Sequence, residues 1–204
     1  MTPCPERAKF LTVWNTHSRI AETIAQSHIE DLSKFTPPVS IFSKYIPTTS
    51  LPPSPANGTL VDLDTPDEEA IRSLIMGIVH RTLGDLVTSR AFLEDSVKRH
   101  SQVKCSTWVC GVALFELAVL DLKEAEEATG KHSSEPSKGE VLLAGVSKWS
   151  KAIESAKRKL DRAMSVSGKE VDLSSRLDSR VMMLRDEIEL KQELIMGRTT
   201  LKSG

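Results

Sequence analysis

The sequence is short of cysteine, of aromatic side chains and of any excess of one charge. Its three cysteines, Cys4, Cys105 and Cys110, are too few for a disulfide scaffold, and an odd number suits a reducing compartment. With 27 basic and 28 acidic side chains the formal net charge is −1, which gives no electrostatic reason to expect binding to nucleic acid or to an anionic membrane. The longest nearly uncharged apolar run covers residues 108–120, whereas a membrane-spanning helix needs about 20 residues. The composition therefore excludes a collagen, a disulfide-rich mini-protein and an integral membrane protein.

Proline is concentrated in one part of the chain. Seven of the ten prolines lie between residues 35 and 67, and only Pro136 follows Pro66. Because proline removes a backbone donor and disfavours helix in the residue before it, we expect an extended linker over residues 36–64 that is disordered at 46–62. This divides the chain into three parts: an N-terminal helical segment (1–35), a Pro-rich linker (36–64) and a helical domain (65–199).

Apolar residues recur at three- and four-residue steps in every part of the chain that is poor in proline, which is typical of helices. One helix is predicted in the N-terminal segment, over residues 6–34. Five are predicted in the domain, over residues 66–82, 86–100, 106–128 and 140–165 and from 173 onward. The helix at 106–128 carries apolar residues on most sides, so it should be buried on most sides. No alternating strand pattern is present, and the expected fold class is all-α.

Residues 68–100 fit the plan of a tetratricopeptide repeat, a helix pair with a 34-residue period and small residues where the helices touch. Gly77 allows a close approach of the second helix, and Gly84 with Asp85 makes the tight turn. Ser89 and Ser96 occupy the small-residue positions of the second helix. We expect about two degenerate repeats, arranged as antiparallel helical hairpins, followed by a capping helix. A helical bundle without repeats is the alternative.

Three segments resemble the tetratricopeptide repeat protein 39 family, whose fungal branch is called the inclusion body clearance proteins, or mitochondrial outer membrane tetratricopeptide proteins. Residues 107–120 (TWVCGVALFELAVL) resemble the family's "W-V…A-hydrophobic-aromatic-E-L-A" helix. Residues 67–94 resemble its preceding repeat, and residues 172–180 (DLSSRLDSR) resemble its closing "S-x-R-L-x-x-R" helix. The resemblance covers about residues 65–195 and corresponds to the C-terminal part of family members.

This resemblance implies a non-enzymatic protein-interaction adaptor that acts in the clearance of misfolded-protein inclusions. Helical repeats bind peptides or partner helices on long concave surfaces, so the expected partners are proteins. The family also implies peripheral association with lipid droplets or the mitochondrial outer membrane, and a location in the cytoplasm or nucleus. One alternative is a truncated or remnant family member without independent activity. A helical small-ligand binder or enzyme is another.

Side chains that carry chemistry are scattered along the sequence. Cys105 and Cys110 fall on different helix faces with no His or Cys pair at zinc spacing, and we expect buried thiols. His80 stands where a repeat usually has Tyr, so we expect it to pack in the core. No phosphate-binding loop, zinc-protease motif or nucleophile–base arrangement is readable. We therefore expect no catalytic residue, no cofactor and no metal ion.

Glu116 is the strongest candidate for a site, because it is the one charge within the apolar run at 108–120. A buried carboxylate needs a partner. Arg176 and Arg180 share one face of the last helix at i, i+4, and we expect a structural ion pair between Glu116 and one of them. The acidic end of the helix at 106–128 and the basic helix at 140–165 are expected to be solvated faces with local ion pairs. A groove for a partner is the alternative there.

Overall fold

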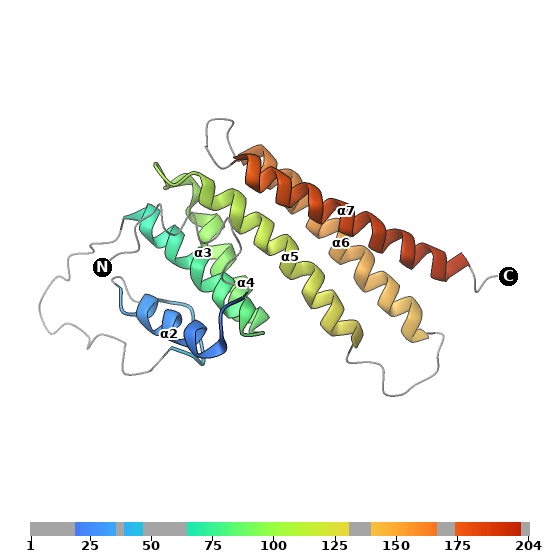
Figure 1. Cartoon of the computed structure of the whole chain (residues 1–204), viewed down its shortest axis with the longest axis horizontal. Helices are drawn as coiled ribbons and strands as arrows, with labels where there is room; N and C mark the ends of the chain where they lie inside the picture. Colours follow the sequence, from blue (N-terminus) through green and yellow to red (C-terminus); the bar gives the residue numbers. More distant parts are fainter. Residues whose placement is uncertain (1–18, 36–38, 47–64, 131–139, 167–173, 201–204) are drawn as a thin grey trace, which may run out of the picture.

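The computed structural model describes residues 19–35, 39–46, 65–130, 140–166 and 174–200 (Figure 1). Within these ranges the regular secondary structure is entirely helical, as predicted, and the domain helices follow the predicted ranges closely. Their bounds are α2 (Glu22–Ser33), α3 (Pro66–Thr82), α4 (Leu86–Lys98) with the short 3-10 helix η3 (Arg99–Ser101), α5 (Trp108–Gly130), α6 (Glu140–Val166) and α7 (Ser174–Thr200).

The start and the end of α3 are fixed by local sequence. The Thr65 hydroxyl accepts a hydrogen bond from the backbone N–H of Glu68, and the Glu68 carboxylate accepts the backbone N–H of Thr65 at 2.8 Å. This reciprocal cap satisfies two backbone donors that would otherwise lack a partner. After α3, Gly84 adopts a positive φ of 75°, which favours glycine. The Asp85 carboxylate then accepts the N–H of Thr88 and begins α4.

The α3–α4 pair is held by close backbone contact. A Cβ added to Gly77 would lie 2.6 Å from Leu93 Cγ, so only glycine lets the two helices approach this far. The Ser89 hydroxyl donates to the Gly77 carbonyl at 2.7 Å, and the Ser96 hydroxyl donates to the Ala70 carbonyl at 2.9 Å. The small residues predicted for this contact are therefore the ones that make it.

The long helix α5 runs between the α3–α4 pair on one side and the α6–α7 pair on the other (Figure 1). This central position explains why α5 is apolar on most sides. The helices α5, α6 and α7 run in alternating directions (Figure 1). Each of the last two buries one stripe against its neighbours: Ile153, Ala156, Leu160 and Ala163 of α6, and Leu177, Val181, Leu184 and Ile188 of α7.

The loop before α5 is tied to the start of α3 by Asp67. Its carboxylate accepts three backbone N–H groups, from Lys104 at 3.0 Å, from Cys105 at 2.9 Å and from Ser106. Partial burial acts to raise the pKa of Asp67, but these N–H donors outweigh it and hold the pKa below its usual value. One carboxylate thus sets the position at which α5 begins.

The N-terminal segment differs from the predicted helix over 6–34. Ala21 has an extended backbone (φ −67°, ψ 151°), so the helix begins only at Glu22, and Ile20 before it packs against the core. The helix α2 buries Ala25, Ile29 and Leu32 in the same core as α3. Although a proline-rich linker separates the two in sequence, α2 packs directly on the domain.

Part of the predicted linker also packs on the domain. Within residues 39–46, which form neither helix nor strand, Val39, Ile41, Tyr45 and Ile46 contact the core. The prolines of this region predict an extended linker, but its large apolar side chains favour packing on the core. Residues 6–18 of the predicted helix and most of the predicted disordered stretch lie outside the described residues.

Candidate functional site

Glu116 lies in the third turn of α5, within its apolar stretch. Its side chain is only 1% exposed, and its neighbours along the helix are apolar. An ionised carboxylate at such a position is unfavourable unless charged or hydrogen-bonding groups compensate for the lost water. Two guanidinium groups do so here, one from α7 and one from α3.

Arg180 of α7 donates a hydrogen bond from Nη2 to Glu116 Oε1 at 2.8 Å. The same guanidinium lies 4.2 Å from the centre of the Phe115 ring, in a position suited to a cation–π contact. Arg81 of α3 reaches the other carboxylate oxygen, with Nη2 2.7 Å from Oε2. That second contact is a close ion pair whose N–H groups are not aligned for a hydrogen bond. We call Arg81, Glu116 and Arg180 the Glu116 cluster.

The structure thus brings together two of the three residues predicted for the site. Arg180 meets Glu116, whereas Arg176, one turn earlier on α7, is exposed. Arg81 is a partner of Glu116 that was not predicted. A signal for it was present, because Arg81 continues the inward stripe of Ile71, Leu74 and Ile78 at steps of three and four residues.

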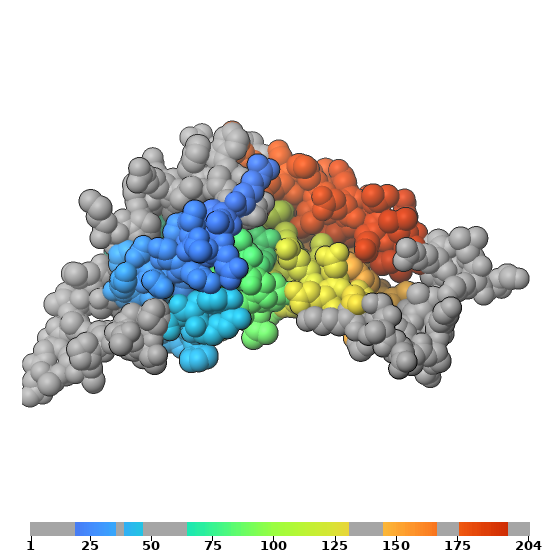
Figure 2. All heavy atoms as spheres, turned by 60° about the horizontal axis from the view of Figure 1, so that its bottom comes forward, coloured from blue at the N-terminus to red at the C-terminus, as the bar shows by residue number. Residues whose placement is uncertain are grey.

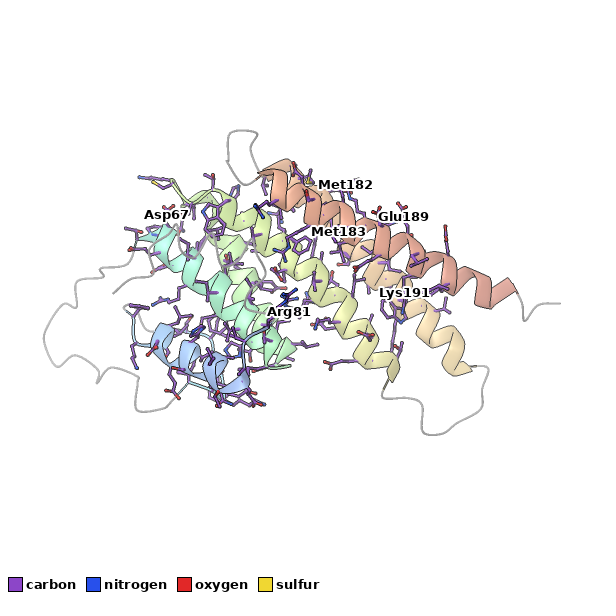
Figure 3. All side chains as sticks on the ribbon, in the orientation of Figure 1. Asp67, Arg81, Met182, Met183, Glu189 and Lys191 are labelled. Carbon is purple, nitrogen blue, oxygen red and sulfur yellow. The ribbon has the colours of Figure 1, made fainter. Side chains whose placement is uncertain are left out.

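The Glu116 cluster connects α3, α5 and α7 at one point (Figure 3 labels Arg81). Arg81 is 8% and Arg180 18% exposed, so the cluster is largely closed to water. Its geometry suits neutralisation of a buried charge and fixed positions for three helices.

A second group of charges joins α4, α5 and α6. Asp121 of α5, only 7% exposed, accepts Arg90 Nη2 of α4 at 2.7 Å and Lys159 Nζ of α6 at 2.5 Å. Arg90 also binds both carboxylate oxygens of Glu124, at 3.0 and 2.7 Å. Burial acts to lower the pKa of Arg90, but the two carboxylates raise it above its usual value. At Asp121 the prediction of a solvated face was therefore wrong, because α5 is flanked by cations on both sides.

His80 is fully buried and packs between aromatic rings, which agrees with the role predicted for it. Its ring stacks on Phe92, with centroids 5.4 Å apart, and lies 5.8 Å from the ring of Tyr45. Burial lowers the pKa of His80; Lys44 lowers it further, and the Asp85 carboxylate 3.4 Å away raises it only in part. The imidazole is therefore neutral at neutral pH.

The cysteines differ in exposure. Cys110 is buried, and burial raises the pKa of its thiol, which makes the reactive thiolate scarcer. Cys105 is exposed, contrary to the prediction of a buried thiol. Across the described part of the chain, no three His, Cys, Asp or Glu side chains gather in a way that could hold a metal ion. Among the same residues, no helix is both long enough and apolar enough to cross a bilayer.

Comparison of the chain with protein-family models, with curated proteins and with solved structures finds no match. What the fold and the site define is a class of protein: over the residues that the structure describes it is helical, and its central helices are joined by buried and half-buried ion pairs. The family resemblance of residues 65–195 stays a prediction.

Proposed function

We propose that this chain is a non-enzymatic protein-interaction adaptor built on tetratricopeptide-like helix pairs. The observation that carries the proposal is the α3–α4 contact. Gly77 against Leu93, the turn at Gly84 and the two buried serines of α4 are the small residues that such a helix pair uses at its crossing and its turn. Helix pairs of this kind serve as binding surfaces for peptides and partner helices.

The second helix pair supports a degenerate version of the plan. The pair α5–α6 follows α3–α4 with the same alternation of direction, and α7 runs alongside α6 (Figure 1). However, α5 has 23 residues and α6 has 27, against 17 for α3 and 13 for α4. The second pair therefore exceeds a 34-residue period, and we assign one repeat of ordinary length and one elongated repeat.

The biological setting comes from the sequence resemblance. We propose that the chain takes part in the clearance of misfolded-protein inclusions, in the cytoplasm or nucleus, with peripheral association at lipid droplets or the mitochondrial outer membrane. Its partners in that setting are proteins.

A clearance assay tests this function. Cells that lack the chain and express a fluorescent aggregation-prone reporter should keep their inclusions longer than wild-type cells, and re-expression of the chain should restore clearance. A variant with Gly77→Leu, which forces α3 and α4 apart, should fail to restore it, whereas Gly145→Ala should succeed because a Cβ there meets only Thr129 at 3.7 Å. Equal clearance with and without the chain would contradict the proposed setting.

A further inference from the structure

The outward face of α7 is both apolar and acidic. Between residues 182 and 194 its exposed large apolar side chains are 54–65% exposed: Met182, Met183, Leu190 and Leu194. The exposed charged side chains of the same stretch are all carboxylates: Asp186, Glu187, Glu189 and Glu193. We call these eight residues the α7 outer face, and Figure 2 shows α7 along one edge of the molecule.

The cations of this stretch, Arg185 and Lys191, contact α6. Arg185 donates from Nη2 to Asp161 of α6 at 2.6 Å, and Lys191 Nζ lies 4.3 Å from the centre of the Trp149 ring of α6. Glu189 and Lys191 project to opposite sides of α7 (Figure 3). In this stretch of α7 the cations thus contact α6, whereas the carboxylates are exposed to solvent.

The apolar residues of the face are spaced for contact with another helix. Met183, Leu190 and Leu194 are separated by seven and four residues, so their side chains form one stripe along the helix. The opposite stripe of α7 is already buried in the core, as Val181, Leu184 and Ile188 show. Methionine side chains adapt to differently shaped partners. Because exposed apolar stripes with charged flanks mark interaction surfaces, the arrangement fits an amphipathic helix.

We propose that the α7 outer face binds an amphipathic helix of a partner protein that carries Lys or Arg beside its apolar stripe. The proposal rests on the proposed adaptor function and names the chemistry of its partner. Four carboxylates beside the stripe attract a basic helix and repel an acidic one, as they repel an anionic membrane surface. The apolar stripe supplies the buried area, and the carboxylates supply selectivity.

A synthetic peptide tests this directly. We would titrate the full chain into a fluorescein-labelled peptide made of two Leu-Lys-Lys-Leu-Leu-Lys-Leu units and follow fluorescence anisotropy, with the Glu-for-Lys version of the peptide as the acidic control. The basic peptide should bind and the acidic one should not. Binding should weaken by about tenfold in M183S/L190S, which removes the centre of the stripe, and by a similar factor in the charge reversal E187K/E189K. All four side chains are exposed, so both variants should keep the helical circular dichroism of the wild type.

The matched control is V87S/E126K, which removes one exposed apolar and one exposed acidic side chain from α4 and α5. It should bind the basic peptide as the wild type does. Equal binding of both peptides, no binding of either, or equal weakening in the control variant would overturn the proposal. So would a concentration-dependent dimer of the wild type that M183S/L190S converts to monomer in sedimentation, because a second copy would then be the occupant. If the basic peptide does not bind but the chain restores clearance in cells, the proposed binding face is wrong and the adaptor function remains supported.

Discussion

The Glu116 cluster makes the carboxylate of Glu116 a stability determinant at the scale of single residues. Replacing Glu116 by Gln removes the negative charge that lies between the guanidinium groups of Arg81 and Arg180 in a largely dry site. Removing one member of such a pair costs about 3–5 kcal/mol. We therefore expect E116Q to lower the free energy of unfolding by an amount in that range, measured by urea titration.

A double-mutant cycle separates the pair from the general effect of burial. Arg180→Met combined with E116Q should show a coupling of about 1 kcal/mol or more, because the two side chains share a hydrogen bond. Arg176→Met is the matched control on the same helix. Because Arg176 is exposed whereas Glu116 is buried, its coupling to E116Q should be close to zero. Equal couplings for both arginines would show that the Glu116–Arg180 contact is not the source.

His80 predicts a dependence of stability on pH. Its pKa in the folded state is depressed by burial, so between that pKa and the ordinary value of 6.5 the unfolded state binds more protons than the folded state. The free energy of unfolding is therefore highest above about pH 6.5, where His80 is neutral in both states, and it decreases as the pH falls below that value. The urea concentration at the unfolding midpoint should be lower at pH 5.5 than at pH 7.5. The variant His80→Phe, which retains an aromatic ring beside Phe92, should show a smaller difference between the two pH values. An unchanged difference in the variant would assign the pH dependence to other groups.

At this scale the sequence was informative where a residue conflicted with its surroundings. Glu116 could be predicted as buried because it interrupts an apolar run. The helix face shared by Arg176 and Arg180 limited its predicted partner to these two arginines. The choice between Arg176 and Arg180 depends on the rotation of α7 against α5, and no single-sequence pattern encodes that rotation. Asp67 could not be predicted as the anchor of the loop before α5, because its partners lie 37–39 residues away.

At the scale of helices, Gly77 and Gly145 make a matched pair. Gly77→Ala would place a Cβ 2.6 Å from Leu93 Cγ and 3.2 Å from the Leu93 backbone nitrogen, so α4 would have to shift. Overpacking of this kind costs about 1–3 kcal/mol. Gly145→Ala meets only ordinary contact and should stabilise α6 by about 0.5–1 kcal/mol. Thermal unfolding of the two variants should move in opposite directions, and a neutral Gly77→Ala would refute the close α3–α4 contact.

The domain helices were predictable because their boundaries carry local signals. Thr65, Glu68 and Gly84 start and end helices through hydrogen bonds and backbone angles that involve only their neighbours. The error in the N-terminal segment has the opposite cause. Ile20, the helix α2 and residues 39–46 pack against a core that includes α3, and α3 lies beyond the proline-rich stretch.

At the scale of the whole molecule, the helices form one connected core. The helix α5 is linked to α3 and α7 through the Glu116 cluster and to α4 and α6 through Asp121. Two ion-pair groups on one helix therefore join the N-terminal and C-terminal halves of the described structure. This connection gives the proposed binding face of α7 a fixed place relative to the α3–α4 pair.

The central claim is that Glu116 holds α3 and α7 to α5, and amide hydrogen exchange of E116Q measures this most directly. E126Q is the matched control, because Glu126 is exposed on the same helix. The account predicts that E116Q reduces protection in α3 and in α7 together, while E126Q leaves both as in the wild type. Protection that falls in α5 alone, or in neither α3 nor α7, would contradict it.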